Sequence, residues 1–325
     1  MLAGYAILDG YDLGVGALHL FSKGDNERRL MINSIGPVWD GNEVWLVTGG
    51  GALFAAFPDV YATMASGFYL AVFLLLFSLI FRAVAIEFRS KQEHPAWRRT
   101  WDVAFSVASI VSTFLFGIVL GNMIWGIPLG ADKEFQGTFL SLLHPYALLC
   151  GVMVLATCMM HGSIYVVMKT EGELHEKARG WVKNTIIFFA ISYITLTMAT
   201  MLYAPHMVDH IKKYPVFFLI PLAQLLIIAN IPRCIYKGKD FLAFLSSSTA
   251  IVLFLFLFGS GIFPNMVYSN PNPEHSLTIY NAASSQKTLG IMFVIALIGM
   301  PLVIGYTTYI HWMFRGKVKL DKNSY

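Results

Sequence analysis

The sequence predicts an all-α, polytopic membrane protein, and three observations lead to that class. Hydrophobic residues make up 56% of the chain and charged residues only 13%, whereas a soluble globular protein is usually about 45–50% apolar and about 25% charged. The mean hydropathy is +0.61. Apolar runs of about 20 residues recur along the whole length, and each is long enough to cross a hydrocarbon layer about 30 Å thick.

We expect about nine transmembrane helices, arranged as two four-helix bundles plus one peripheral helix. Asp102 opens the fourth apolar segment and Asp240 the eighth, each after a basic loop. This offset indicates two similar units, roughly 1–124 and 140–262, with a last helix at 287–313, all within one transmembrane domain, 1–325. Chance similarity between apolar sequences explains the same pattern. The spans lie near 1–21, 35–56, 60–86, 101–124, 140–168, 181–204, 215–232, 241–262 and 287–313.

Charged and turn-forming residues set these boundaries. The second and third spans are separated only by Phe57-Pro58-Asp59, a tight turn at one membrane face. The polar, proline-rich stretch 263–286 separates the eighth span from the ninth. The first span begins almost at Met1, without the features of a signal peptide, and is barely long enough before Lys23. We therefore expect that the chain lacks the first residues of its first helix or starts from an internal methionine.

The distribution of basic residues predicts the orientation. Most of the 23 lysines and arginines fall after the first, third, fifth and seventh spans and in the C-terminal tail. Because cytoplasmic loops are rich in Lys and Arg, the N-terminus is expected outside and the C-terminus in the cytoplasm. The loops of the opposite side hold only Lys133, Lys212, Lys213 and Lys287.

Composition also argues against several site types. The formal net charge is +4, and no basic tract indicates a nucleic-acid partner. Cys150, Cys158 and Cys234 stand alone within apolar runs, without a CxxC or a Cys/His zinc spacing, so we expect neither a disulfide framework nor a metal site.

A polar constellation is expected near the cytoplasmic face. Asp12 lies about 13 Å from the inner end of the first helix, at 1.5 Å per residue, and Asp40 lies about 8 Å from the start of the second. Arg82, near the end of the third, has a similar depth. Ionisable groups at these positions are costly and need an explanation.

The spacing of the acidic residues adds detail. Asp9 and Asp12, like Asp40 and Glu43, are i,i+3 pairs that share a helix face. Two carboxylates this close keep a proton unless a cation intervenes, and Arg82 is the obvious cation. Two interpretations stay open: a proton or ion entry path from the cytoplasm, and an ion-paired network that packs the helices.

Glycines and histidines leave further alternatives. Gly10, Gly14 and Gly16 in the first helix and the triple glycine 49–51 in the second permit close helix packing, and the triple glycine could instead break its helix. Any histidine at membrane depth could bind haem iron. However, no two share a helix face, so packing roles are expected for His19, His144, His161 and His311.

Several motifs resemble subunit II of the cytochrome bd-type quinol oxidases, in order across essentially the whole chain. The most specific block covers residues 27–58 and includes ERRLMINSIGPVWDGNEVW and GGALFAAFP. The other motifs are GYAILDGYDLGVG at 4–16, SGFY at 66–69, FRAVAIEFRSK at 81–91, WRRTWD at 97–102, GELH at 172–175 and SLTIYNAASSQ at 276–286. The first helix is usually longer in this family.

The resemblance implies a function. The family's two large subunits form a heterodimer in the bacterial cell membrane that oxidises membrane quinol and reduces O2 to water. Subunit I carries the haems, two of b type and one of d type. Subunit II contributes assembly and part of a proton path, and is not catalytic alone. The implied partners are subunit I, membrane quinol and the lipid bilayer, with a structural quinone and a small accessory subunit as further candidates.

The resemblance also assigns residues. Asp40 matches the acidic position of the W-D-G-N motif linked with the proton path, Asp12 matches the aspartate of the G-Y-D-L-G-V-G motif, and Arg82 matches the arginine of the third helix. Glu43 falls where some members carry glutamine. Two other functions stay open: an ion-coupled secondary transporter that uses the same residues, and a purely structural subunit.

Overall fold

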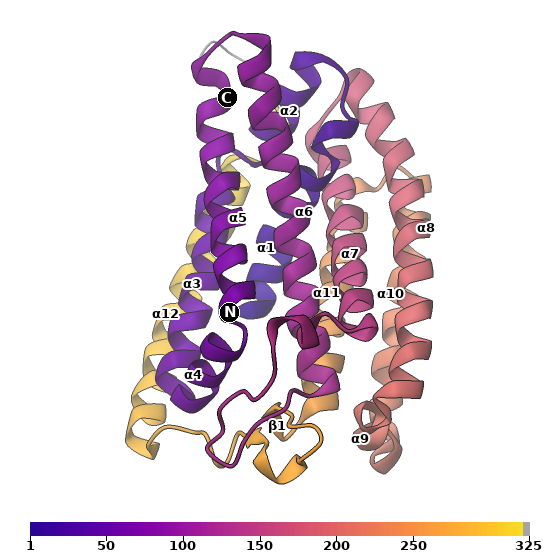
Figure 1. The fold of residues 1–325 in the computed structure, drawn as a ribbon. Helices are drawn as coiled ribbons and strands as arrows, with labels where there is room; N and C mark the ends of the chain where they lie inside the picture. Colours follow the sequence, from indigo (N-terminus) through magenta and orange to yellow (C-terminus); the bar gives the residue numbers. More distant parts are fainter. Residues whose placement is uncertain (321–325) are drawn as a thin grey trace.

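The long apolar segments form helices that run side by side (Figure 1). The structure, a computed structural model, describes residues 1–320. Its helices are α1 (Leu2–Leu18), α2 (Gly24–Ile35), α3 (Trp39–Ala56), α4 (Pro58–Gly67), α5 (Tyr69–Phe88), α6 (Pro95–Trp125), α7 (Pro145–Lys169), α8 (Gly172–Tyr203), α9 (Asp209–Lys213), α10 (Leu219–Tyr236), α11 (Asp240–Ile262) and α12 (Gln286–Met313). The strands β1 (Asn265–Val267) and β2 (Leu277–Thr278) pair antiparallel.

The two ends of the bundle differ in character. One end carries α2, the turn between α5 and α6, and the turn between α10 and α11, and we call it the basic end. The other end carries β1 and β2 together with the loop at 126–144 (Figure 1). This arrangement agrees with the predicted distribution of loops, because the segments rich in Lys and Arg gather at the basic end.

The predicted class of an all-helical membrane protein is confirmed, apart from the short strand pair. Within residues 1–320, seven helices are long and apolar enough to cross a membrane, and they correspond to the third to ninth predicted spans. The remaining two predicted spans are α1, which has 17 residues, and α3, which has 18 residues and includes Asp40 and Glu43. The count of nine spans is therefore not confirmed.

Some boundaries differ from prediction for local reasons. The third predicted span is divided at Phe68 into α4 and α5, and α4 begins at Pro58, directly after α3. Helix α6 starts at Pro95, where proline is favoured in the first turn. Helix α8 starts at Gly172, at φ +68°, well before the predicted 181. In α6 and α8, polar residues extend the helix beyond its apolar core.

Helix α7 lies at the centre of the bundle, packed against α1, α6 and α8. Its crossing with α1 is very close, because a Cβ atom on Gly14 would overlap the backbone carbonyl of Cys158, and one on Gly162 would meet the backbone of Gly14 and Val15. Close packing of the first helix is therefore confirmed. In contrast, α12 packs mainly on α3, and no residue in its apolar stretch is buried within this chain.

The triple glycine has a different role from that of Gly14. Helix α3 runs unbroken through Gly49–Gly51, so the alternative of a helix break is wrong. A Cβ on Gly49 would contact Leu2, whereas Cβ atoms on Gly50 and Gly51 would meet no atom of residues 1–320 within 4 Å. Among the described residues, therefore, the first of the three glycines serves close packing and the other two do not.

Replacing Gly14 by alanine is expected to lower the stability of the folded protein by about 1–3 kcal/mol, because the added methyl group forces α1 and α7 apart. The melting temperature of the protein in mild detergent measures the effect. Gly180→Ala is the matched control, since a Cβ on Gly180 of α8 meets nothing within 4 Å. Equal melting temperatures for the two variants would contradict the close α1–α7 contact.

Candidate functional site

A buried arginine joins three helices near the basic end. The Arg82 side chain on α5 is fully buried. Its Nη2 atom lies 2.5 Å from Oδ1 of Asp9 on α1 and 2.7 Å from Oε1 of Glu43 on α3. Asp9 is fully buried, and Glu43 keeps 23% of its side chain exposed. The predicted cation is therefore in place, and its partners are one member of each predicted i,i+3 pair.

Asp12 lies in a second, connected group. Its Oδ2 accepts a hydrogen bond of 2.7 Å from Nδ2 of Asn42, which also donates to the hydroxyl of Tyr11 at 2.9 Å. The Tyr11 hydroxyl in turn lies 2.9 Å from Nε2 of His311 on α12. Asp12 and Tyr11 are fully buried. Hydrogen bonds between polar side chains thus connect α1 to both α3 and α12.

Asp40 lies outside this cluster. It occupies the first turn of α3, where its side chain is exposed, and within residues 1–320 no ion pair engages it. The similar depths of Asp12, Asp40 and Arg82 stay a prediction, but among the described residues Asp40 is not a partner of Arg82. Glu43 lies three residues, or about 4.5 Å, deeper than Asp40 along α3. This difference in position lets Glu43, and not Asp40, contact Arg82.

A second buried cluster, centred on Asp102, closes the basic end. Asp102 Oδ1 lies 2.6 Å from Nε2 of His19 and 2.5 Å from Nε of Arg89, and its Oδ2 accepts from Nη1 of Arg28 at 2.9 Å. Arg89 also binds Asp25 at 2.9 Å. The cluster ties the turn after α1, helix α2, the turn after α5 and helix α6 together.

Sequence reasoning did not identify this second cluster as a site. Asp102 was considered only as a marker of a possible repeat and as the last residue of the motif WRRTWD. A usable signal was present, because Asp102 opens an apolar stretch immediately after a segment rich in arginine. A carboxylate in that position needs a cationic partner before it can be buried.

The histidines predicted to lie at membrane depth all have protein partners. His161 is fully buried, with Nδ1 2.7 Å from the Ser247 hydroxyl and Nε2 3.1 Å from the Ile7 carbonyl oxygen. His144 accepts from a backbone amide at the start of α7, near the opposite end of the bundle. In the part of the chain that the structure describes, no group of three or more His, Cys, Asp or Glu side chains could hold a metal ion.

Truncating Asp102 to alanine is expected to destabilise the protein by about 3–5 kcal/mol, because Arg89 would be left buried without its carboxylate. Asp240→Ala is the matched control. Its partner Arg179 lies at 3.4 Å and both side chains are partly exposed, so the loss should be at most about 1 kcal/mol. Thermal unfolding in mild detergent measures both variants. Equal losses would show that the Asp102 cluster does not hold the basic end together.

Comparison with known proteins gives a consistent answer. A family model described as cytochrome bd terminal oxidase subunit II matches residues 1–314. The cytochrome bd-I ubiquinol oxidase subunit 2 of Escherichia coli strain K12 is 34% identical over 349 residues, which cover 98% of this chain and 92% of that protein. The cytochrome bd ubiquinol oxidase subunit 2 of Bacillus subtilis strain 168 is 33% identical over 323 residues, with coverages of 98% and 94%.

A solved structure supports the fold. The bd oxidase from Geobacillus thermodenitrificans contains a chain that superposes with a TM-score of 0.77 at 17% identity, covering 96% of this chain and 94% of that one. At this identity the likeness concerns the fold alone. The family model and the two relatives extend over nearly the whole sequence, and this chain therefore belongs to the family of cytochrome bd terminal oxidase subunit II.

Proposed function

We propose that this chain is the non-haem subunit of a terminal oxidase in a bacterial cytoplasmic membrane. In this complex a heterodimer oxidises membrane quinol and reduces O2 to water. Family membership supports the proposal, and the relatives from Escherichia coli and Bacillus subtilis are both named as ubiquinol oxidase subunits. The chain alone is then not catalytic and requires a haem-bearing subunit I.

Three of the histidines predicted to lie at membrane depth, His19, His161 and His311, have the Nε2 atom engaged by a protein partner, which supports placing haem b and haem d in subunit I. An axial ligand must offer a ring nitrogen to the iron. Both nitrogens of His161 are engaged, and Nε2 of His19 is held by Asp102. His311 is likewise engaged at both nitrogens, by Tyr11 and by its own helix. We therefore assign no electron-transfer step to these residues.

The observation that carries a proton-uptake role is the excess of carboxylates around Arg82. Asp9 and Glu43 contact the guanidinium, and Asp12 lies close enough for electrostatic interaction with it. A single guanidinium faces three carboxylates, so protons are the remaining source of positive charge within the cluster. Acidic groups at membrane depth commonly serve as proton relays.

The graded burial of the acidic residues supports an order for the path. Asp40 is exposed at the basic end, Glu43 is partly buried three residues further along α3, and Asp9 and Asp12 are fully buried. The proposed path therefore enters at Asp40, passes Glu43 and Arg82, and reaches the buried aspartates. From there it leads towards the haems of the partner subunit.

Unpaired polar atoms along this path favour hydration. Nε and Nη1 of Arg82, Oδ2 of Asp9 and Oδ1 of Asp12 have no hydrogen-bond partner among the described residues. Burying such a group without a partner costs about 1–3 kcal/mol. Water or a polar group of the partner subunit is therefore expected to reach them, and water would carry protons between the carboxylates.

Replacing Asp40 by asparagine is expected to leave the haem content of the purified complex near normal and to slow steady-state oxygen consumption about tenfold, or roughly 1.4 kcal/mol in activation free energy. The amide keeps the size of the side chain but cannot take up a proton. Asp59→Asn, an exposed carboxylate at the opposite end of the bundle, is the matched control. Oxygen-electrode rates and proton-uptake traces measure both variants.

The possible results distinguish a proton-path role of Asp40 from a structural role, and an oxidase from a transporter. Normal turnover and normal proton uptake in Asp40→Asn would remove the proton-path role. Severe loss of haem would favour a structural role for the same residue. Purification in mild detergent tests the complex itself: a partner with visible haem absorbance supports the oxidase, whereas a colourless, functional homo-oligomer supports a transporter.

The proposed orientation places the basic end in the cytoplasm, with the N-terminus outside. Cys150, Cys158 and Cys234 are buried, so a membrane-impermeant maleimide should react only with an added surface cysteine. In spheroplasts, Ala131→Cys at the strand end should be labelled at once, and Gln92→Cys at the basic end only after lysis. The opposite labelling pattern would contradict the orientation.

A further inference from the structure

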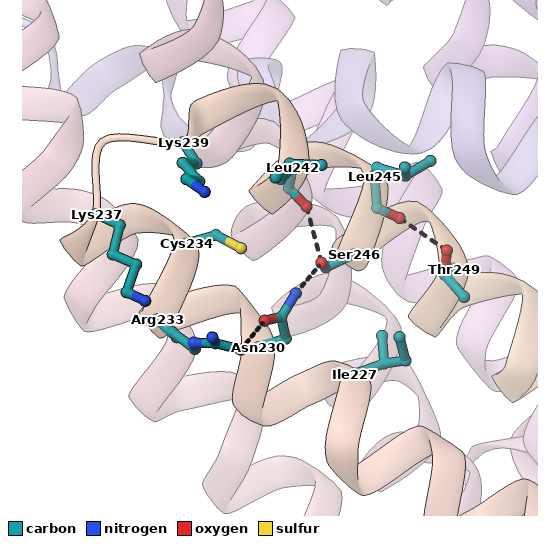
Figure 2. A pocket seen from close by; sticks show the side chains of 10 residues that line it. All are labelled: Ile227, Asn230, Arg233, Cys234, Lys237, Lys239, Leu242, Leu245, Ser246 and Thr249. Atoms are coloured by element: carbon teal, nitrogen blue, oxygen red, sulfur yellow. Dashed lines mark hydrogen bonds between the residues drawn. The ribbon is translucent and has the colours of Figure 1, made fainter.

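A cavity opens between α10 and α11 at the basic end. Its volume is about 310 Å³, and none of the residues that line it belongs to the cluster around Arg82 or to the cluster around Asp102. Three cationic side chains surround it, from Arg233 at the end of α10 and from Lys237 and Lys239 in the turn that follows (Figure 2). The positive φ of Gly238, +65°, lets the chain reverse between these two lysines, which places both side chains at the cavity.

These three cations lack a carboxylate partner among residues 1–320. In the part of the chain that the structure describes, none of the three forms an ion pair with a carboxylate. The nearest acidic residue in sequence, Asp240, is paired instead with Arg179 at 3.4 Å. The cavity therefore concentrates positive charge and lacks the counter-charge that would normally accompany it.

The remaining lining is partly polar and partly apolar. Asn230 donates from Nδ2 to the Ser246 hydroxyl at 3.0 Å across the two helices (Figure 2). Ile227 and Leu245 lie on the side of the cavity away from the lysines, and Leu242 lies nearer to them. An occupant must therefore combine an anionic, hydrogen-bonding head with an apolar body.

The surface that continues from the cavity towards the membrane interior is also apolar. On α10 the side chains of Leu222, Leu225 and Leu226 are 53–65% exposed, and on α11 those of Leu245 and Phe256 are about half exposed. The cavity opens at the level of the cytoplasmic headgroups in the orientation given above. Basic pockets between membrane helices on that side suit anionic headgroups.

We propose that this cavity binds the headgroup of an anionic glycerophospholipid of the cytoplasmic leaflet. The lipid phosphate would contact Arg233, Lys237 and Lys239, the hydroxyls of the headgroup would face Asn230 and Ser246, and the acyl chains would lie along α10 and α11. A free phosphate ion would satisfy the cations but leave the apolar wall uncovered, so the lipid fits the whole site better. The lipid assignment does not depend on the oxidase activity.

The test uses the complete purified complex and a triple variant, Arg233→Gln, Lys237→Gln and Lys239→Gln. Phosphatidylglycerol is the probe, phosphatidylcholine the neutral comparison and inorganic phosphate the free anion. Native mass spectrometry counts bound lipid, and the melting temperature follows each addition. The matched control, Lys91→Gln with Arg99→Gln and Lys183→Gln, removes the same charge from exposed cations at the same end.

The wild-type and control complexes should retain phosphatidylglycerol and melt at a higher temperature when it is added. The triple variant should bind it about a hundredfold more weakly, as expected for the loss of three cations near a charged headgroup. Equal binding by the triple variant and the wild type would overturn the proposal. Protection by inorganic phosphate equal to that by phosphatidylglycerol, or equal protection by phosphatidylcholine, would do so as well.

Discussion

Burial of the Arg82 guanidinium constrains how the first helices of this protein can be arranged. A guanidinium removed from water must be compensated, and its partners Asp9 and Glu43 come from two other helices. The helix axes and their rotations must therefore keep α1, α3 and α5 in one register. A buried ion pair is weak evidence for stability, because apolar residues of similar size often serve as well or better. Its presence at membrane depth is easier to explain by chemistry that requires charge.

Helix α1 couples this constraint to the remainder of the bundle. One face places Asp9 and Asp12 towards α3 and α5, while Gly14 permits backbone contact with α7. The chain then continues to His19, which binds Asp102 on α6. A shift of α1 along its axis would therefore disturb the Arg82 cluster, the α7 crossing and the Asp102 cluster together. This connection explains how a helix of 17 residues can occupy a fixed position in the bundle.

Much of this arrangement could be predicted from the sequence, but its register could not. The lengths of the hydrophobic runs are sufficient to predict the fold class and the third to ninth spans. The two i,i+3 pairs of acidic residues indicated that Arg82 is their cation. Choosing Glu43 over Asp40 required knowing the level of α3 to within one turn, which depends on how α1 and α12 pack against it. The Asp102 cluster escaped prediction because its members are separated by up to 83 residues, and only the fold brings them together.

The charged groups near the basic end form three sites that differ in their balance of positive and negative charge. Each site therefore requires a different compensating charge. Asp102 is surrounded by His19, Arg28 and Arg89, so the charge of its carboxylate is compensated within the chain. The Arg82 cluster has more carboxylates than cations, and the smallest mobile charge that restores balance is a proton. The α10–α11 cavity has cations without carboxylates, and the abundant anion at that depth of a bacterial membrane is a lipid phosphate. Charge balance, considered for each cluster separately, therefore distinguishes a structural site from the proposed proton site and the proposed lipid site within one helical bundle.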